Sequence, residues 1–256
     1  MLFGMARKGA RKTREPLPPP LPPETRTVGQ VVAEAINLYR RNFWPSLALG
    51  IGPAAAGVGL VLIPGWWDLG FALTAGVLLM TVSYLGAVLI ATEKRAERRA
   101  LLVGAAAGYV VFLPTPFLYS LFILPAILWL ALFGLAVPAA VIERRSFRGS
   151  LRRGFELARA DYVHAAGSLA TLVIVGLLSS TVLFFLLRSG SEIALAIAAF
   201  LSLLVISPIL FLGAALLYFD QAARDSKRRS DAHVHHADQP DRPGRADAEG
   251  EPRPSA

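Results

Sequence analysis

The chain has no cysteine among its 256 residues, which excludes a disulfide framework, a thiolate nucleophile and a cysteine metal site. Charge is also scarce, because only 17% of the residues are charged whereas 54% are hydrophobic. The sequence contains no Gly-rich phosphate loop, nucleophile elbow or zinc-ligand spacing. This composition excludes a disordered protein and favours a polytopic membrane protein over a soluble one.

Charge is missing above all from four long apolar runs. The run 43–92 contains one charged residue, Asp68, and the runs 100–142, 163–187 and 193–219 contain none. A hydrocarbon core about 30 Å thick needs about 20 apolar residues for each helix that crosses it. The four runs therefore predict two, two, one and one spans, which makes an all-α polytopic membrane protein with six transmembrane helices.

The basic residues lie almost entirely outside these runs. The segments 1–42, 93–99, 143–162 and 220–256 carry 8, 4, 6 and 7 Lys and Arg residues, and Arg188 is the one that remains. The positive-inside rule places such segments in the cytoplasm. We therefore expect a multi-pass protein of the cell membrane with both termini cytoplasmic.

Three regions follow from the composition along the chain. Residues 1–26 predict a disordered basic and Pro-rich arm, residues 27–219 the six-helix membrane domain, and residues 220–256 a disordered cytoplasmic tail. Neither the arm, the loops nor the tail is long enough for a separate folded catalytic domain.

Two amphipathic helices are expected at the cytoplasmic surface. The first begins at Thr27, which forms a capping box with Gln30, and Asn42 is then expected to cap the first span. The second covers 144–162. Its apolar stripe is predicted to consist of Phe147, Leu151, Phe155, Ala158 and Tyr162.

The run 100–142 must turn within itself to hold two spans. Two positions are candidates, Leu113–Pro116 and the neighbourhood of Leu124–Pro125, and we favour a turn near 122–126. Pro138 cannot donate a backbone hydrogen bond, so we expect it to kink the fourth span near the inner surface.

The two junctions between a surface helix and a span resemble each other. Ile36–Trp44 aligns without a gap on Phe155–Val163: an apolar anchor, a Leu and an Arg are followed by Asn or Asp and an aromatic or apolar residue. This similarity has two explanations, an internal repeat or convergence on residue types that any such junction favours.

Four short segments also resemble a known family: Asn37–Trp44, Leu135–Glu143, Ser150–Leu157 and Leu217–Asp220. Together they resemble the membrane domain attached to some bacterial glycerophosphoryl diester phosphodiesterases, and related stand-alone polytopic membrane proteins. The resemblance covers about 27–225. It implies a six-helix bundle in the cytoplasmic membrane, and in the fused enzymes catalysis belongs to a separate soluble barrel that has no counterpart in this sequence.

Acidic residues gather with arginines at the predicted inner surface. We interpret them as ion-pairing and capping groups that fix the surface helices, and the alternative is a headgroup or metal site. The residues to which we assign a structural role at the inner face are Asn42, Pro138, Glu143, Asp161, Tyr218 and Asp220.

The arginines of the surface helices are predicted to hold them against anionic lipids, because each basic residue near an anionic leaflet contributes about 1 kcal/mol. The predicted lipid-binding residues are Arg40, Arg41, Arg144, Arg145, Arg148, Arg152, Arg153 and Arg159. Nucleic-acid binding is not expected, because this charge faces the membrane.

No ionisable residue lies in the middle of a predicted span, which argues against a proton-coupled pump and an intramembrane hydrolase. The leading hypothesis is a non-enzymatic membrane protein without cofactor or metal that engages anionic lipids or a protein partner through its inner-face helices. One alternative is a carrier or channel for a small or lipid-like solute, and another is the membrane subunit of an enzyme whose catalytic part is a separate chain. A polar, membrane-deep cavity open to one side would favour the carrier, and a tightly packed bundle the scaffold.

Overall fold

The computed structural model describes residues 26–63, 65, 67–93, 96–187 and 192–237. Nearly all of them are helical, and no strand occurs among them. Six segments are long and apolar enough to cross a membrane, which confirms the predicted all-α polytopic fold: Phe43–Leu60, Trp67–Thr92, Arg98–Leu121, Ile123–Ile142, Tyr162–Ser179 and Ile197–Asp231.

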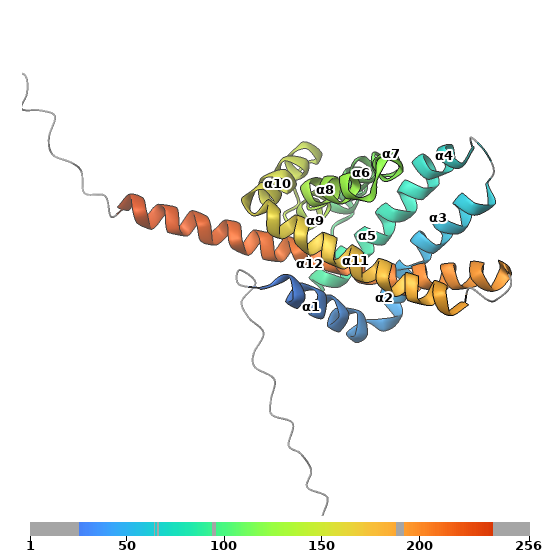
Figure 1. Cartoon of the computed structure of the whole chain (residues 1–256). Coiled ribbons are helices and arrows are strands. Elements are labelled where there is room, and N and C mark those ends of the chain that lie inside the picture. Colours follow the sequence, from blue (N-terminus) through green and yellow to red (C-terminus); the bar gives the residue numbers. More distant parts are fainter. Residues whose placement is uncertain (1–25, 64, 66, 94–95, 188–191, 238–256) are drawn as a thin grey trace, which may run out of the picture.

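Four of the six spans are built from more than one helix. The helix α1 (Val28–Arg41) precedes the first span, and α10 (Phe147–Ala160) connects the fourth span to the fifth. The first span consists of α2 (Phe43–Leu49) and α3 (Ile51–Leu62), and the second of α4 (Trp67–Phe71), the π-helix η2 (Ala72–Gly76) and α5 (Val77–Thr92). The third consists of α6 (Arg98–Phe112) and α7 (Thr115–Leu121), and the fourth of α8 (Ile123–Phe133) and α9 (Ala136–Ile142). The fifth and sixth are the single helices α11 (Tyr162–Leu187) and α12 (Glu192–Ala237). Figure 1 shows α11 and α12 side by side, and the other spans packed beside them.

The third and fourth spans are separated at Phe122. Its backbone is extended, with φ −176° and ψ 159°, between the last residue of α7 and the first of α8. This position confirms the expected turn near 122–126. The other candidate, around Leu113 and Pro114, is also a break, but there the chain continues from α6 into α7 within the same span.

Pro138 interrupts the fourth span as predicted. The helix stops at Phe133 and restarts at Ala136. A proline leaves the carbonyl four residues earlier without its helical partner, and here that carbonyl belongs to Gly134. The Tyr84 hydroxyl donates to the Gly134 oxygen at 3.1 Å. A side chain of α5 therefore satisfies the group that Pro138 leaves free.

A second proline, Pro208, lies inside α12. It frees the carbonyl of Leu204, which lies against Gly50 at the joint between α2 and α3. A Cβ atom added at Gly50 would meet the Leu204 carbonyl and its Cα atom. Glycine thus allows the first and sixth spans to approach backbone to backbone, as small residues do where membrane helices pack closely.

The helix α10 packs on the bundle through a face that shares only Ala158 with the predicted apolar stripe. Phe147 is 36% exposed and Phe155 only partly buried. The buried face consists of Ser150, Gly154, Leu157 and Ala158. A Cβ at Gly154 would lie 2.5 Å from the backbone nitrogen of Ala136. The close approach of α10 to α9 therefore requires a glycine at position 154, next to the fully buried Leu157.

Asn42 lies between α1 and α2 as expected, but its side chain does not cap the second of them. Its amide donates back to the Leu38 carbonyl at 3.4 Å, and no side-chain bond reaches the start of α2. The equivalent residue of the other junction does cap: Asp161 Oδ1 accepts from the His164 backbone nitrogen at 3.2 Å. At Thr27 the backbone nitrogen donates to Gln30 Oε1 at 2.8 Å.

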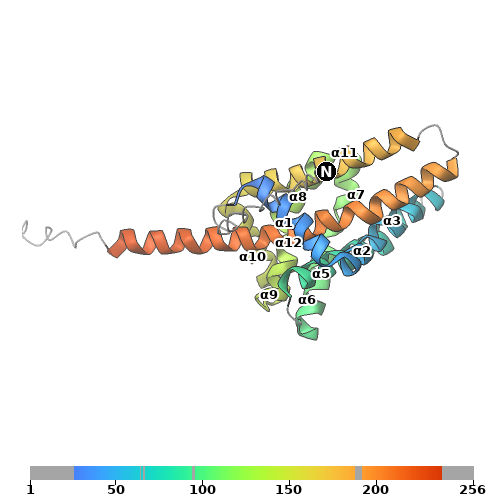
Figure 2. The ribbon, with the colours of Figure 1, turned by 90° about the horizontal axis from the view of Figure 1, so that it is seen from below.

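The expected boundary of the tail at residue 220 is wrong. The helix α12 continues without interruption from the sixth span to Ala237, and Asp220 and Gln221 are fully buried. Figures 1 and 2 show this part of α12 passing α10 and projecting beyond the bundle. The first part of this segment is held by contacts with α10 and the residues that follow it: Arg224 bonds to Asp161, Asp225 to Arg153, and Arg228 to the Ala160 carbonyl. The rest of the predicted tail, and the arm up to residue 25, lie outside the described residues.

Candidate functional site

The basic segments come together at one end of the bundle, which we call the basic end. Ion pairs join them across the spans: Arg41 to Glu93 at 3.4 Å, Arg144 to Glu97 at 3.9 Å, and Arg26 to Asp220 at 3.4 Å. The opposite end, where α3 approaches α4 and α7 meets α8, we call the cavity end.

Glu143 is the centre of the first polar cluster of the basic end. Its carboxylate accepts from the Tyr218 hydroxyl at 2.6 Å, from Arg153 Nε at 3.1 Å and from Arg145. Arg153 also donates to Asp225 at 2.8 Å. Burial alone would raise the pKa of Glu143, but these bonds and the charge of Arg153 outweigh it and lower that pKa. The cluster therefore holds an ionised carboxylate that connects α9, α10 and α12.

Asp161 is the centre of a second cluster. It accepts from Arg224 at 2.8 Å, and Arg224 donates in turn to the backbone carbonyl of Arg26 at 2.9 Å. Arg26 pairs with the fully buried Asp220. This cluster joins the start of α11, the described end of the N-terminal arm, and α12. Of the six predicted inner-face residues, Glu143 lies beside Tyr218, and Asp161 lies close to Asp220 through Arg224.

Arg153 differs from the other arginines that were predicted to bind lipid. Its side chain is 12% exposed and is held by Glu143 and Asp225, and the same two partners raise its pKa against the effect of burial. This guanidinium connects helices and does not face lipid. The remaining members of the predicted set are exposed: Arg40, Arg41, Arg144, Arg145, Arg148, Arg152 and Arg159.

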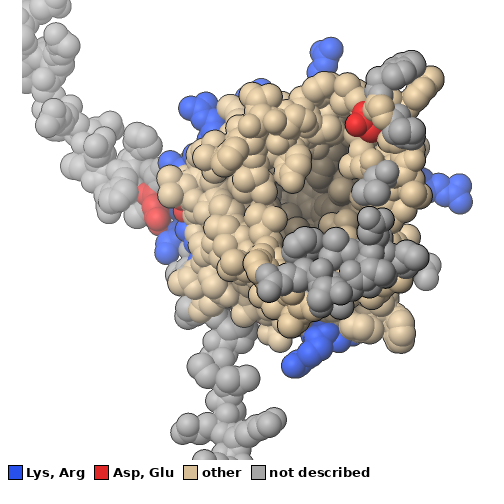
Figure 3. Space-filling view, turned by 45° about the vertical axis from the view of Figure 1, so that its right-hand side comes forward, with Lys and Arg blue, Asp and Glu red and all other residues tan. Residues whose placement is uncertain are grey.

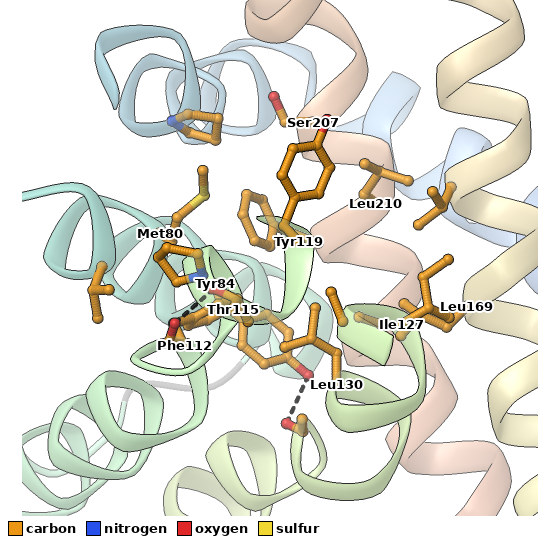
Figure 4. Close-up of a pocket in the computed structure, with 18 of the residues that line it drawn as sticks. Met80, Tyr84, Phe112, Thr115, Tyr119, Ile127, Leu130, Leu169, Ser207 and Leu210 are labelled. Atoms are coloured by element: carbon orange, nitrogen blue, oxygen red, sulfur yellow. Dashed lines mark hydrogen bonds between the residues drawn. The ribbon is translucent and has the colours of Figure 1, made fainter. Parts of the chain in front are cut away.

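A cavity of about 460 Å³ occupies the middle of the bundle. Side chains from all six spans line it, so it lies on the bundle axis (Figure 4). On α12 the lining residues run from Leu203 to Leu217, a distance of about 21 Å along a helix that rises 1.5 Å per residue. The cavity therefore penetrates well over half of a hydrocarbon core about 30 Å thick.

The floor of the cavity is aromatic. The rings of Tyr84, Phe112 and Phe211 meet with centroids 6.0 to 6.4 Å apart. Leu135 and Leu217 are the lining residues nearest to the basic end in sequence, and the next residue of α12, Tyr218, already bonds to Glu143. The cavity thus ends where the first polar cluster begins.

Polar atoms in the lining are mostly engaged with the backbone. The Thr115 hydroxyl donates to the Phe112 carbonyl at 2.6 Å, Ser207 donates to Leu203, and Tyr84 donates to Gly134. Tyr119, which is 65% exposed, is the exception, because no bond joins its hydroxyl to another described residue. The membrane-deep cavity is therefore apolar, where the carrier hypothesis expected a polar one.

The cavity opens at the cavity end. Figure 3 looks obliquely at this end and shows a hollow bordered largely by residues other than Lys, Arg, Asp and Glu. The lining residues of α3 and of the two helices that meet at Phe122 extend to this side: Leu60, Tyr119 and Ile123. An apolar space of this size, within the range of about 300 to 1,000 Å³ typical of ligand sites, can hold the hydrocarbon part of a ligand.

The described residues contain no group of three or more His, Asp or Glu side chains placed to hold a metal ion. Comparisons with protein-family models, with curated proteins and with solved structures give no match to this chain. The resemblance to the phosphodiesterase-associated membrane domain consequently stays a prediction.

Sequence reasoning missed two sets of residues. Arg224, Asp225, Arg228 and Arg229 fell within the predicted tail, although no Pro or Gly interrupts the chain from 214 to 239, a sign that the helix can continue. The cavity lining gave no signal at all. Apolar residues around a cavity and apolar residues in a packed core form the same pattern in a sequence.

Proposed function

We propose that this protein binds the hydrocarbon part of a lipid-like molecule in its central cavity and serves as a carrier for it. The observation that supports this proposal is the depth and apolar character of the cavity. Apolar cavities stay dry and accept apolar ligands, so an acyl chain is a better occupant than water or an ion.

The aromatic floor favours a binding site or a carrier over an open channel. The rings of Tyr84, Phe112 and Phe211 lie in the lining between the opening of the cavity and the ion pairs of the basic end. A solute that crossed the bundle would have to pass these rings and the Glu143 cluster. The ligand therefore enters and leaves at the cavity end, unless the floor opens.

Tyr119 favours an amphiphile over a pure hydrocarbon. Its hydroxyl belongs to α7, which ends at the turn near the opening. An amphiphile with its chain toward the floor places its polar group near this hydroxyl and near water. This orientation leaves no charged group inside the apolar lining.

A second observation supports contact of the basic end with anionic lipids. The exposed arginines of α1 and α10 all lie at that end, where the positive-inside rule places the cytoplasm of a bacterial cell membrane. The lipid-contacting set that we propose is the predicted one without Arg153, because the guanidinium of Arg153 is held by two carboxylates.

Filling the cavity tests the proposed function. Ala72 of η2 lines the cavity, and Ala106 of α6 is exposed on the outer face of the bundle. We expect Ala72→Trp to lose lipid that the wild-type protein retains in native mass spectrometry after mild detergent extraction. The control Ala106→Trp, which adds the same side chain outside the cavity, should retain it.

The proposal would be overturned if the two tryptophan variants and the wild-type protein retained the same lipid in the same amount. Thermal unfolding of the three proteins shows whether Ala72→Trp keeps the fold. A photoreactive fatty acid then gives a second readout, because its crosslinking yield should also fall in Ala72→Trp alone.

A further inference from the structure

A groove runs along the basic end between α10 and the part of α12 that projects beyond the bundle. It has a volume of about 620 Å³ and is open to the surface. Four arginines line it, two from each helix, namely Arg152, Arg159, Arg228 and Arg229. The groove exists only because α12 continues past Asp220, so the predicted tail concealed it.

The charges of the groove do not balance. The four arginines face two carboxylates, Glu156 and Asp225, and Asp225 is shared with Arg153, which approaches it at 2.8 Å from the bundle side. The lining of the groove therefore has two more positive than negative charges. A bound dianion would neutralise them.

The arginines keep donors free for such an anion. Arg152 bonds to Glu156 at 2.8 Å and Arg229 to Asp225 at 3.0 Å. Arg228 donates to the Ala160 carbonyl at 2.7 Å, and Arg159 stacks on the Phe155 ring at 5.4 Å. A guanidinium has five N–H donors, so each of these contacts positions an arginine and leaves most of its donors unused.

Phe155 gives the groove an apolar side. It lines the groove and stacks on Phe133 of α8, with the ring centroids 5.8 Å apart. A phosphate bound by the arginines would thus have an apolar surface next to it. This arrangement suits a phosphate that is attached to a hydrocarbon chain better than a free phosphate ion.

We infer that this groove is a binding site for a phosphate monoester, and specifically for the headgroup of a phosphatidic acid type of lipid. Planar guanidinium groups bind phosphate oxygens through paired, charge-assisted hydrogen bonds. The site rests on the proposed contact of the basic end with anionic lipids and gives that contact a location. It does not depend on the central cavity.

The test is isothermal titration calorimetry of the full-length protein in detergent with water-soluble dioctanoyl phosphatidic acid. We expect the double variant Arg159→Gln/Arg228→Gln to weaken binding by about 100-fold, roughly tenfold for each charge-assisted bond. The control Arg98→Gln/Arg99→Gln removes the same charge from exposed residues of α6 that lie outside the groove and outside the proposed lipid-contacting set, and should change the affinity by less than about threefold because salt screens exposed charges. Glu156→Gln should tighten binding, because it removes a carboxylate and frees Arg152.

Two further titrations identify the ligand. Inorganic phosphate should compete, and dioctanoylglycerol, which lacks the phosphate, should not bind the groove. Equal affinity for inorganic phosphate and for the lipid would support the phosphate site and assign it to a soluble ligand. Unfolding temperatures near that of the wild type, expected for these exposed residues, show that the variants are folded.

Two results would overturn the inference in different ways. An equal loss of affinity in both double variants would show that only the overall charge of the basic end matters. That result would contradict the groove as the binding site and would still support contact of the basic end with anionic lipids. Undiminished binding of phosphatidic acid by both double variants, or equal binding of dioctanoylglycerol, would contradict both.

Discussion

The two ends of this bundle differ in how they use their buried side chains. At the basic end, Glu143, Arg153 and Asp225 connect three helices through short hydrogen bonds. At the cavity end, α12 and the other five spans surround an apolar space. This cluster has little freedom, because each of its charges has a partner on another helix. Among the described residues no ion pair joins helices at the cavity end, so that end can adapt to a ligand.

This difference assigns different roles to the two ends. Directional ion pairs fix the relative positions of α9, α10 and α12, so the basic end is the rigid part of the bundle. Dispersion contacts in the cavity lining are non-directional, so that end can hold chains of differing shape. Pro138 lies just after the break in the fourth span, and Pro208 lies inside the continuous helix α12.

The largest expected effect concerns which side of the membrane each end faces. Because the natural chain has no cysteine, single cysteines report on accessibility directly. We expect Asp68→Cys, at the cavity end, to react with a membrane-impermeant maleimide in intact cells, and Arg148→Cys, at the basic end, to react only after permeabilisation. The reverse pattern would contradict the orientation and place the cavity opening on the cytoplasmic side.

Removing Arg153 should destabilise the basic end severely. Arg153→Ala leaves two partly buried carboxylates, Glu143 and Asp225, without their shared partner, and breaking a buried pair costs about 3 kcal/mol. The control Arg148→Ala removes an exposed arginine of the same helix and should change the free energy of unfolding by less than about 0.5 kcal/mol. Similar unfolding temperatures for the two variants would show that the basic end is not the rigid part of the bundle.

Close packing at the basic end is tested by one added methyl group. Gly154→Ala would place a Cβ against the backbone of Ala136, and such overpacking costs about 1 to 3 kcal/mol. The control is Gly167→Ala in α11, where no atom lies within 4 Å of the added Cβ. That change should be neutral or stabilising by up to about 1 kcal/mol, since alanine favours a helix. A stabilising Gly154→Ala would refute the close approach of α10 and α9.

The smallest expected effect is a dependence on pH. The pKa of Glu143 is lowered in the folded protein from an ordinary value of 4.5. Its ionised form therefore adds stability above that ordinary value, and this contribution is lost as the pH falls through the lowered pKa. The difference in unfolding temperature between the wild type and Glu143→Gln should accordingly stay constant from pH 7 to about pH 5 and shrink as the pH falls further. A difference that shrinks already above about pH 5 would show that the pKa of Glu143 is not lowered.

The sequence predicted the architecture because hydropathy and charge report directly on the membrane. Apolar runs of about 20 residues and breaks at prolines have local causes, so six spans, the turn at Phe122 and the interruption by Pro138 were all predictable. The two polar clusters were partly predictable, since the sequence places Glu143, Asp161, Tyr218 and Asp220 at the inner face without indicating their partners.

Other features depend on contacts between distant segments and left little local signal. The face on which α10 packs includes the approach of Gly154 to Ala136, which the positions of the apolar residues do not indicate. Residues 220–237 have the composition of a tail, yet they form a helix whose first part bonds to Arg153, Ala160 and Asp161. The cavity reflects how six helices fail to fill the space between them, which no single segment encodes.

The central claim is that a hydrocarbon chain occupies the cavity, and localised crosslinking tests it most directly. A fatty acid with a photoreactive diazirine at the end of its chain is added to the protein in membranes, and the crosslinked residues are mapped by mass spectrometry. The account predicts labelling of the floor, at Met80, Tyr84 or Phe112. Labelling confined to outward-facing residues such as Leu102 and Leu178 would contradict it.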